Sequence, residues 1–107
     1  MACGVPIVAS ESSAHLVYCT SDNSYLVKTT KTPINVPEFI ARNPNFIGGH
    51  SWWIPDFGAA KRMLRKSYEE WKDGSIAKKS VAARSRACDF NSAKCAYKII
   101  YETAKFF

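Results

Sequence analysis

The sequence predicts an α/β fold with two short strands and three C-terminal helices. Residues 6–9 form an apolar run without polar alternation, which fits a parallel strand covered on both faces. A second short strand is predicted at residues 25–28. From Phe57 onward, apolar residues recur at three- and four-residue steps, as in amphipathic helices. These elements fit the C-terminal half of a Rossmann-like layer, in a single partial domain covering residues 1–107.

The segment at residues 1–10 contains the strand around which the rest of the chain is expected to pack; its sequence is Met-Ala-Cys-Gly-Val-Pro-Ile-Val-Ala-Ser. Gly4 can adopt the left-handed conformation that ends many helices, and Pro6 prevents a helix from resuming. Residues 1–3 make less than one helical turn, which is unstable alone because nucleation orders several residues at once. We therefore expect the chain to begin in the middle of an element.

A small polar loop, residues 10–14, follows the first strand. It lies at the carboxyl end of that strand, the edge at which open α/β sheets bind ligands. Ser12 and Ser13 are the candidate ligand contacts, and the alternative is a plain loop that caps the short helix expected at residues 15–20. His15 is the obvious titratable base nearby, but without a carboxylate at a recognisable spacing it is more typical of a structural residue than of a catalytic one.

Residues 29–49 are the least regular part of the sequence. Pro33, Pro37 and Pro44 each remove a backbone donor and disfavour helix at the preceding residue. We expect an irregular insertion at residues 29–49, between the second strand and the next helix, with a short helical turn at residues 37–42. Of the following pair Trp52 and Trp53, we expect at least one to anchor packing and only the other to be exposed.

The clearest helix is predicted at residues 57–73, with Asp56 as its N-cap. One apolar stripe runs along it, and the basic residues lie off this stripe on a face expected to be solvated; the stripe consists of Phe57, Ala60, Leu64, Tyr68 and Trp71. A second helix is predicted at residues 75–88 with Ser75 as its cap, and a third at residues 92–107 with Asn91 as its cap.

Composition predicts a globular chain with an ordinary core and a bias toward anionic partners. The chain has 107 residues, 47% of them hydrophobic, and a net charge of +6.

Neither histidine stands at zinc-ligand spacing to the cysteines, so no metal site is expected. The cysteines lack a Cys-x-x-Cys pair and are expected to be reduced, with two or three packed inside: Cys3, Cys19, Cys88 and Cys95. With no signal peptide or span-length window, the expected location is cytoplasmic, with peripheral membrane contact through the basic surface as a further option.

Four segments in the same order resemble a known enzyme family. Residues 1–10 resemble the segment that follows the second glutamate of a two-glutamate motif in family 4 retaining glycosyltransferases of the GT-B fold. Asn-Ser-Tyr-Leu-Val at residues 23–27 resembles a hairpin segment of that family. The tryptophan pair followed by Pro55 and Asp56 resembles the start of its next helix, and Phe90 before a polar cap resembles the start of its closing helix. The insertion at residues 29–49 is unmatched.

The resemblance implies transfer of a sugar from a nucleotide-sugar donor to an acceptor, with retention at the anomeric carbon and no essential metal. It places Ser12 and Ser13 near the donor phosphates, in a loop where the family often has glycines. The two motif glutamates would lie before Met1, so no catalytic residue is assigned and the chain alone is expected to be inactive. The missing N-terminal half and the nucleotide-sugar donor are the implied partners. The alternatives are a small basic module that binds nucleic acid or another anionic polymer, and a gene remnant without a function.

Overall fold

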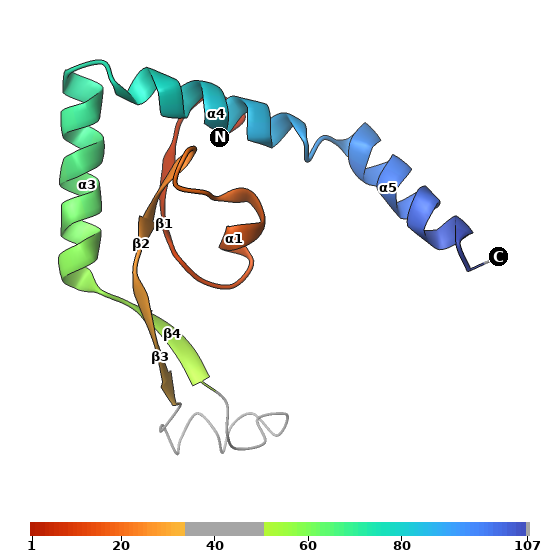
Figure 1. Cartoon of the computed structure of the whole chain (residues 1–107), viewed down its shortest axis with the longest axis horizontal. Coiled ribbons are helices and arrows are strands. Elements are labelled where there is room, and N and C mark those ends of the chain that lie inside the picture. Colours follow the sequence, from red (N-terminus) through yellow and green to blue (C-terminus); the bar gives the residue numbers. More distant parts are fainter. Residues whose placement is uncertain (34–50, 107) are drawn as a thin grey trace.

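The computed structural model describes residues 1–33 and 51–106. Within these residues the fold is mixed α/β, with four helices and two small sheets of two strands each (Figure 1). In chain order the elements are β1 (Ile7–Ser10), α1 (His15–Tyr18), β2 (Ser24–Val27), β3 (Thr29–Pro33), β4 (Ser51–Pro55), α3 (Phe57–Lys72), α4 (Ile76–Cys88) and α5 (Ser92–Ala104). The α/β class and the three C-terminal helices are confirmed, whereas the described residues contain four strands rather than two.

The first sheet pairs β1 with β2 in parallel, from Ile7 opposite Ser24 to Ser10 opposite Val27. The prediction of a parallel first strand is confirmed, but every residue of β1 is only half-buried, so the strand is not covered fully on both faces. The hairpin expected at residues 23–27 is wrong. Parallel strands need a crossover of about a dozen residues or more, usually helical. The segment between β1 and β2, which contains α1, provides that crossover.

The second sheet pairs β3 with β4 in antiparallel register, from Thr29 opposite Pro55 to Pro33 opposite Ser51. The irregular insertion expected from Thr29 is therefore wrong for residues 29–33. Three of these residues are threonines, whose β-branched side chains favour extended backbone, and the proline is tolerated because it stands at the end of its strand. The rest of the expected insertion, including the helical turn at residues 37–42, lies outside the described residues.

Helix α3 begins at Phe57, as the sequence predicts, and ends at Lys72, one residue before the predicted end. The backbone amide of Ala59 donates a 3.0 Å hydrogen bond to Asp56 Oδ1, and this bond lowers the pKa of the Asp56 carboxyl below its usual value. The helix ends before Asp73, and Gly74 follows with a φ of 82°, a conformation that glycine adopts without steric cost. Asp56 is thus confirmed as the N-cap.

The face of α3 that packs inward is not the apolar stripe. Ala59 is 4% exposed against the first sheet, and Tyr25 of β2 donates a 2.7 Å hydrogen bond from its hydroxyl to Glu70 Oε2. An apolar stripe normally faces the core. Here its large members are exposed, with Phe57 at 78% and Trp71 at 62%. The basic residues of the helix are exposed, as expected, and the large apolar side chains are exposed as well.

Helices α4 and α5 differ in how they contact the rest of the chain. Ala83 of α4 is fully buried, and a side chain at Gly4 would come within 3.7 Å of the Ser80 carbonyl oxygen, so α4 crosses the start of the chain closely. Ser75 is not a side-chain cap of α4; instead its amide donates to Asp73 Oδ1 at 2.8 Å. Asn91 does cap α5, which extends away from the sheets with no buried residue (Figure 1).

The core of the described residues is small. Its buried apolar residues come from β2, α3, α4 and the residue that follows α1: Cys19, Tyr25, Val27, Ala59 and Ala83. All four cysteines are free, but only Cys19 is buried, so the expectation of two or three packed thiols is wrong. The radius of gyration is 18.3 Å. A compact domain of this length has about 13 Å, and the chain is therefore open, with much apolar surface left in solvent.

The buried hydroxyl of Tyr25 predicts a loss of stability at high pH. Burial, together with the hydrogen bond to Glu70, raises the pKa of Tyr25 to about 12. An unfolded tyrosine titrates near 10. The unfolded chain therefore loses this proton first, so the stabilisation is complete below about pH 10 and falls by about 1 to 2 kcal/mol as the pH approaches 12.

Tyr25→Phe should cost about 1 kcal/mol at neutral pH and should lack the tyrosine-dependent decline above pH 10. Urea unfolding of both proteins between pH 7 and about pH 12 measures the difference. Tyr97→Phe is the matched control, because Tyr97 is 71% exposed. An equal decline in Tyr25→Phe and the parent protein would contradict the assignment.

Candidate functional site

The loop at the carboxyl end of β1 is held against the end of β2. The Glu11 amide donates a 2.8 Å hydrogen bond to the Val27 carbonyl oxygen, which extends the parallel ladder by one residue. Thr29 Oγ1 donates at 3.1 Å to the Glu11 carbonyl oxygen. The carboxyl ends of both parallel strands therefore meet at this loop, as expected for the ligand-binding edge of an open α/β sheet.

The two serines predicted to contact a ligand lie in different environments. Ser12 is buried, at 7% exposed, and its amide donates to the Ser10 carbonyl oxygen at 2.9 Å. Ser13 is exposed and has a φ of 55°, the left-handed conformation that disfavours residues with a Cβ. Of the two hydroxyls, only that of Ser13 is well placed for a ligand arriving from solvent.

The sequence did not single out the contact between Ser10 and His15. Ser10 Oγ lies 3.0 Å from His15 Nδ1, and the His15 ring meets Tyr18 edge-on with 6.2 Å between ring centroids. His15 is hydrogen-bonded, as one of the two interpretations of this residue expects. A catalytic serine–histidine pair also needs a group that orients the base, and no such carboxylate contacts His15 within residues 1–33 and 51–106. The pair therefore fixes the start of α1 beside the loop.

Acidic groups are sparse around the loop. Glu11 is exposed in it, Glu70 of α3 is bound to Tyr25 and Lys66, Glu69 and Glu102 are exposed on helices, and Glu38 lies outside the described residues. In the part of the chain that the structure describes, no three His, Cys, Asp or Glu side chains gather as metal ligands do. The loop thus offers hydroxyl and backbone donors rather than metal ligands or a carboxylate pair.

A basic groove lies between this loop and α3. It has a volume of about 480 Å³ and extends along β2 from Glu11 toward α4. Four cationic residues line it: Lys28, Arg62, Lys66 and Lys79. Some already have partners, since Lys66 Nζ is 3.7 Å from Glu70 Oε1 and Lys79 lies 5.2 Å from the centroid of the Tyr25 ring. Sequence reasoning missed this groove because its cations come from distant segments.

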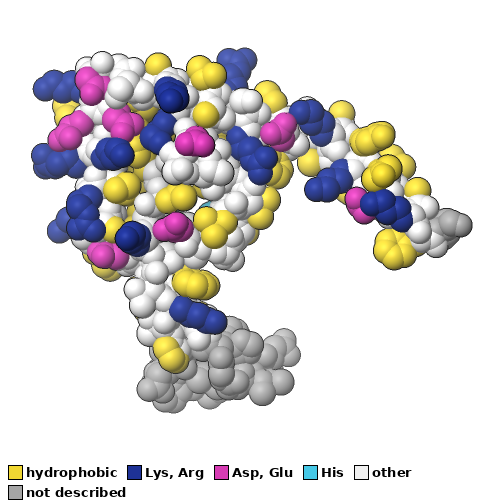
Figure 2. Space-filling view, viewed as in Figure 1, with side chains coloured by type: hydrophobic (Ala, Val, Ile, Leu, Met, Phe, Trp, Pro, Cys, Tyr) yellow, Lys and Arg dark blue, Asp and Glu magenta, His cyan; other side chains and the backbone are white. Residues whose placement is uncertain are grey.

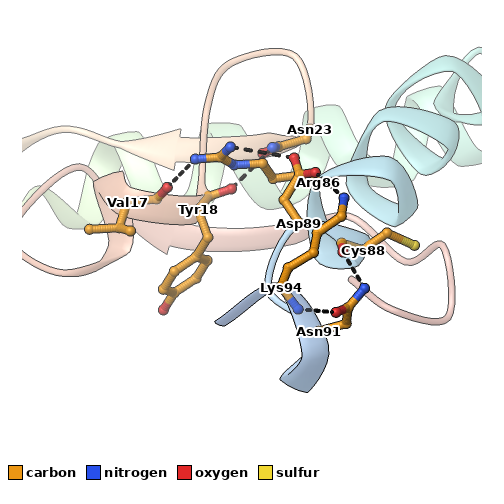
Figure 3. Close-up of polar contacts among 8 residues, drawn as sticks. All are labelled: Val17, Tyr18, Asn23, Arg86, Cys88, Asp89, Asn91 and Lys94. Atoms are coloured by element: carbon orange, nitrogen blue, oxygen red, sulfur yellow. Dashed lines mark hydrogen bonds and ion pairs between the residues drawn. The ribbon is translucent and has the colours of Figure 1, made fainter. Parts of the chain in front are cut away.

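A polar cluster joins α4 to the crossover between β1 and β2 (Figure 3). Arg86 Nη2 donates to the Val17 carbonyl oxygen at 2.5 Å, and Asn23 Nδ2 donates to that of Tyr18 at 3.1 Å. Lys94 Nζ donates to Asp89 Oδ1 at 3.0 Å, and this bond lowers the pKa of the Asp89 carboxyl. These contacts join chain segments, so we assign the cluster a structural role.

Both tryptophans of β4 are half-exposed. Trp52 and Trp53 are each 49% exposed, so the expectation that one would be a packed anchor and only the other exposed is wrong. Trp53 stands opposite Lys31 in the register with β3. The second sheet thus carries aromatic and basic side chains together.

Comparisons with protein-family models, with curated proteins and with solved structures found no match to this chain. None of the helices in residues 1–33 and 51–106 combines the length and the apolar character that a membrane span requires.

The left-handed backbone conformation of Ser13 predicts how substitutions at this position change the stability of the protein. Glycine adopts a positive φ without the steric cost that a Cβ imposes, but it loses more entropy on folding. Ser13→Gly should therefore leave the free energy of unfolding unchanged or raise it by about 1 kcal/mol, whereas Ser13→Val should lower it by about 1 to 2 kcal/mol. Urea unfolding measures both, with Ser85→Gly and Ser85→Val in helix α4 as the contrast, where glycine should destabilise. A destabilising Ser13→Gly would contradict the left-handed conformation.

Proposed function

We propose that this chain is the C-terminal portion of a nucleotide-sugar glycosyltransferase resembling family 4 of the GT-B fold. The observation that carries the proposal is the parallel pair β1–β2, whose carboxyl ends meet at the Ser12–Ser13 loop beside a basic groove. A nucleotide-sugar donor carries a diphosphate. Backbone amides, a hydroxyl and lysine or arginine side chains are the groups that bind phosphate in proteins.

In this proposal the loop contributes to donor binding but does not perform the chemistry. Ser13 donates its hydroxyl to a phosphate oxygen, and Lys28, which follows β2 directly, adds positive charge from the groove. Ser12, which is buried, shapes the turn, because its amide donates to the Ser10 carbonyl oxygen. The glutamates that hold the sugar come from the two-glutamate motif that the resemblance places before Met1. The four free cysteines favour a reducing, cytoplasmic location.

The open architecture also supports a role as part of a larger fold. A two-stranded sheet is marginally stable by itself and needs further strands or helices to cover it. Here β1 is only half-buried, and α5 has no buried residue among the described part of the chain. The missing N-terminal half of the transferase is therefore the proposed partner.

A specific observation favours a second candidate, a module that binds nucleic acid or another anionic polymer. Trp52 and Trp53 are both half-exposed, and Trp53 stands opposite Lys31, on a chain with a net charge of +6. Exposed aromatic rings among cations bind single strands by stacking and by charge. The first candidate is preferred because it also accounts for the order of the elements.

The transferase proposal predicts the coding sequence upstream of Met1. In the same frame it should encode a glutamate two places before Met1, with an alanine between, and another glutamate eight positions earlier. The protein expressed from that extended frame should bind a nucleotide sugar by calorimetry and transfer its sugar, whereas the chain of 107 residues should show no turnover. In the extended protein, Ser13→Ala should raise the donor Kd about tenfold, because it removes a hydrogen bond to a charged group.

Ser85→Ala is the control for that comparison, since Ser85 is exposed on α4, away from the loop. A frame without the glutamates, or turnover by the short chain alone, would overturn the proposal.

The polymer-binding alternative predicts that tryptophan fluorescence changes on addition of oligo-dT with micromolar affinity. Because binding releases counterions, affinity should fall steeply as salt rises. Trp52→Ala with Trp53→Ala should weaken it about tenfold or more, whereas Trp71→Phe should not. Binding that is absent, or insensitive to salt, removes this candidate.

A further inference from the structure

The outer face of α3 carries a line of large apolar side chains in solvent. We define this stripe as Phe57, Leu64, Tyr68 and Trp71, which are 78%, 57%, 60% and 62% exposed. They recur at steps of three, four and seven residues, so they lie on one side of the helix. The Tyr68 and Trp71 rings lie against each other with centroids 5.9 Å apart. A helix of 16 residues is about 24 Å long, so the stripe is a long, narrow apolar band.

Exposed cations flank this stripe on one side. Lys61, Arg65 and Lys72 are exposed and form no ion pair within the described ranges. Lys61 and Arg65 line a shallow depression of about 440 Å³ together with Leu64 and Tyr68, so charge and apolar surface share one face. Lys and Arg side chains gather over α3 at the left edge of the molecule, among a few acidic ones (Figure 2). Glu69 is the exposed acidic residue of this helix.

We propose that the outer face of α3 binds the surface of an anionic membrane, with the helix lying in the plane of the interface. Helices that do so combine a strong apolar side with Lys and Arg on the polar side, and they insert Trp, Phe and Leu side chains at the headgroup boundary. Tyrosine and tryptophan favour that boundary because their rings are amphipathic. Lys61, Arg65 and Lys72 would contact the anionic headgroups beside the inserted stripe.

The shape of the molecule allows this contact. The inward face of α3 is fixed by Ala59 and by the Tyr25–Glu70 hydrogen bond, so the stripe must face away from the first sheet. The helix forms one outer border of the molecule, and no other described element covers its outer side (Figure 1). The binding surface is therefore already formed before the membrane is reached.

Charge favours a membrane over a second copy of this chain. Two copies that met through α3 would bring the same cations together, on chains that each carry a net charge of +6. Like charges facing each other across an interface oppose association. Anionic lipid headgroups attract the same residues. This attraction acts over about a Debye length, which becomes shorter as the salt concentration rises. This inference is independent of the proposed transferase function.

The test is cosedimentation of the full chain with vesicles of phosphatidylcholine alone and of phosphatidylcholine with phosphatidylglycerol. We expect binding to the anionic vesicles, weak or no binding to the neutral ones, and weakening by salt. Lys61→Glu with Arg65→Glu should reduce the partition coefficient at least about tenfold, since each cation near an anionic surface contributes about fivefold. Lys78→Glu with Arg84→Glu, an equal charge change on exposed residues of α4, should reduce it much less.

A second pair of variants tests apolar insertion. Leu64→Gln should weaken binding severalfold, whereas Val81→Gln, on a side chain of α4 that is 72% exposed, should not. Circular dichroism checks that all variants remain folded. Equal loss in both charge pairs would show that net charge alone drives binding and would overturn the assignment to α3. Absence of vesicle binding, together with concentration-dependent dimers that Leu64→Gln abolishes, would overturn it in favour of self-association.

Discussion

The contact between α3 and β2 is the constraint on which the rest of the structure depends. The Tyr25 hydroxyl reaches Glu70 at 2.7 Å, and Ala59, 4% exposed, allows the helix to approach the sheet closely. This contact selects a small and polar face of α3 for the interior. Because a helix cannot present two opposite faces to one sheet, the larger apolar side chains of α3 then point into solvent. The exposed stripe and the basic groove along β2 both follow from this orientation.

Local elements could be predicted from the sequence more fully than their packing. Asp56 and Asn91 are caps because their side chains satisfy free amides within three residues, and such short-range signals are present in the sequence. The orientation of α3 depends on a residue of β2, 45 positions away, which helical periodicity cannot report. The strand Thr29–Pro33 was missed for a related reason: its partner Ser51–Pro55 supplies the ladder, whereas proline content alone suggested irregular structure.

At the candidate site, too, the sequence predicts features set by neighbouring residues but not those set by residues distant in the chain. The loop after β1 was predicted because an apolar run followed by small polar residues marks the end of a buried strand. The different exposures of Ser12 and Ser13 depend on how the turn closes and could not be predicted from residue type. The groove beside the loop draws Lys28 from the end of β2, Arg62 from α3 and Lys79 from α4, so only the tertiary fold brings these cations together.

More large apolar side chains are exposed than buried in the described chain, and this excess points to surfaces that bind other molecules. Five apolar residues form the core of the described chain, whereas seventeen large hydrophobic side chains are exposed. Isolated exposed apolar residues are ordinary, but continuous bands of them mark interaction surfaces. The band on α3 adjoins cations that form no ion pair within residues 1–33 and 51–106, which suits an anionic interface. The apolar side chains of α5 include Tyr97, Ile100 and Tyr101 on a helix without buried residues. The proposed membrane surface would cover the band on α3, and the proposed N-terminal half of the transferase would cover α5.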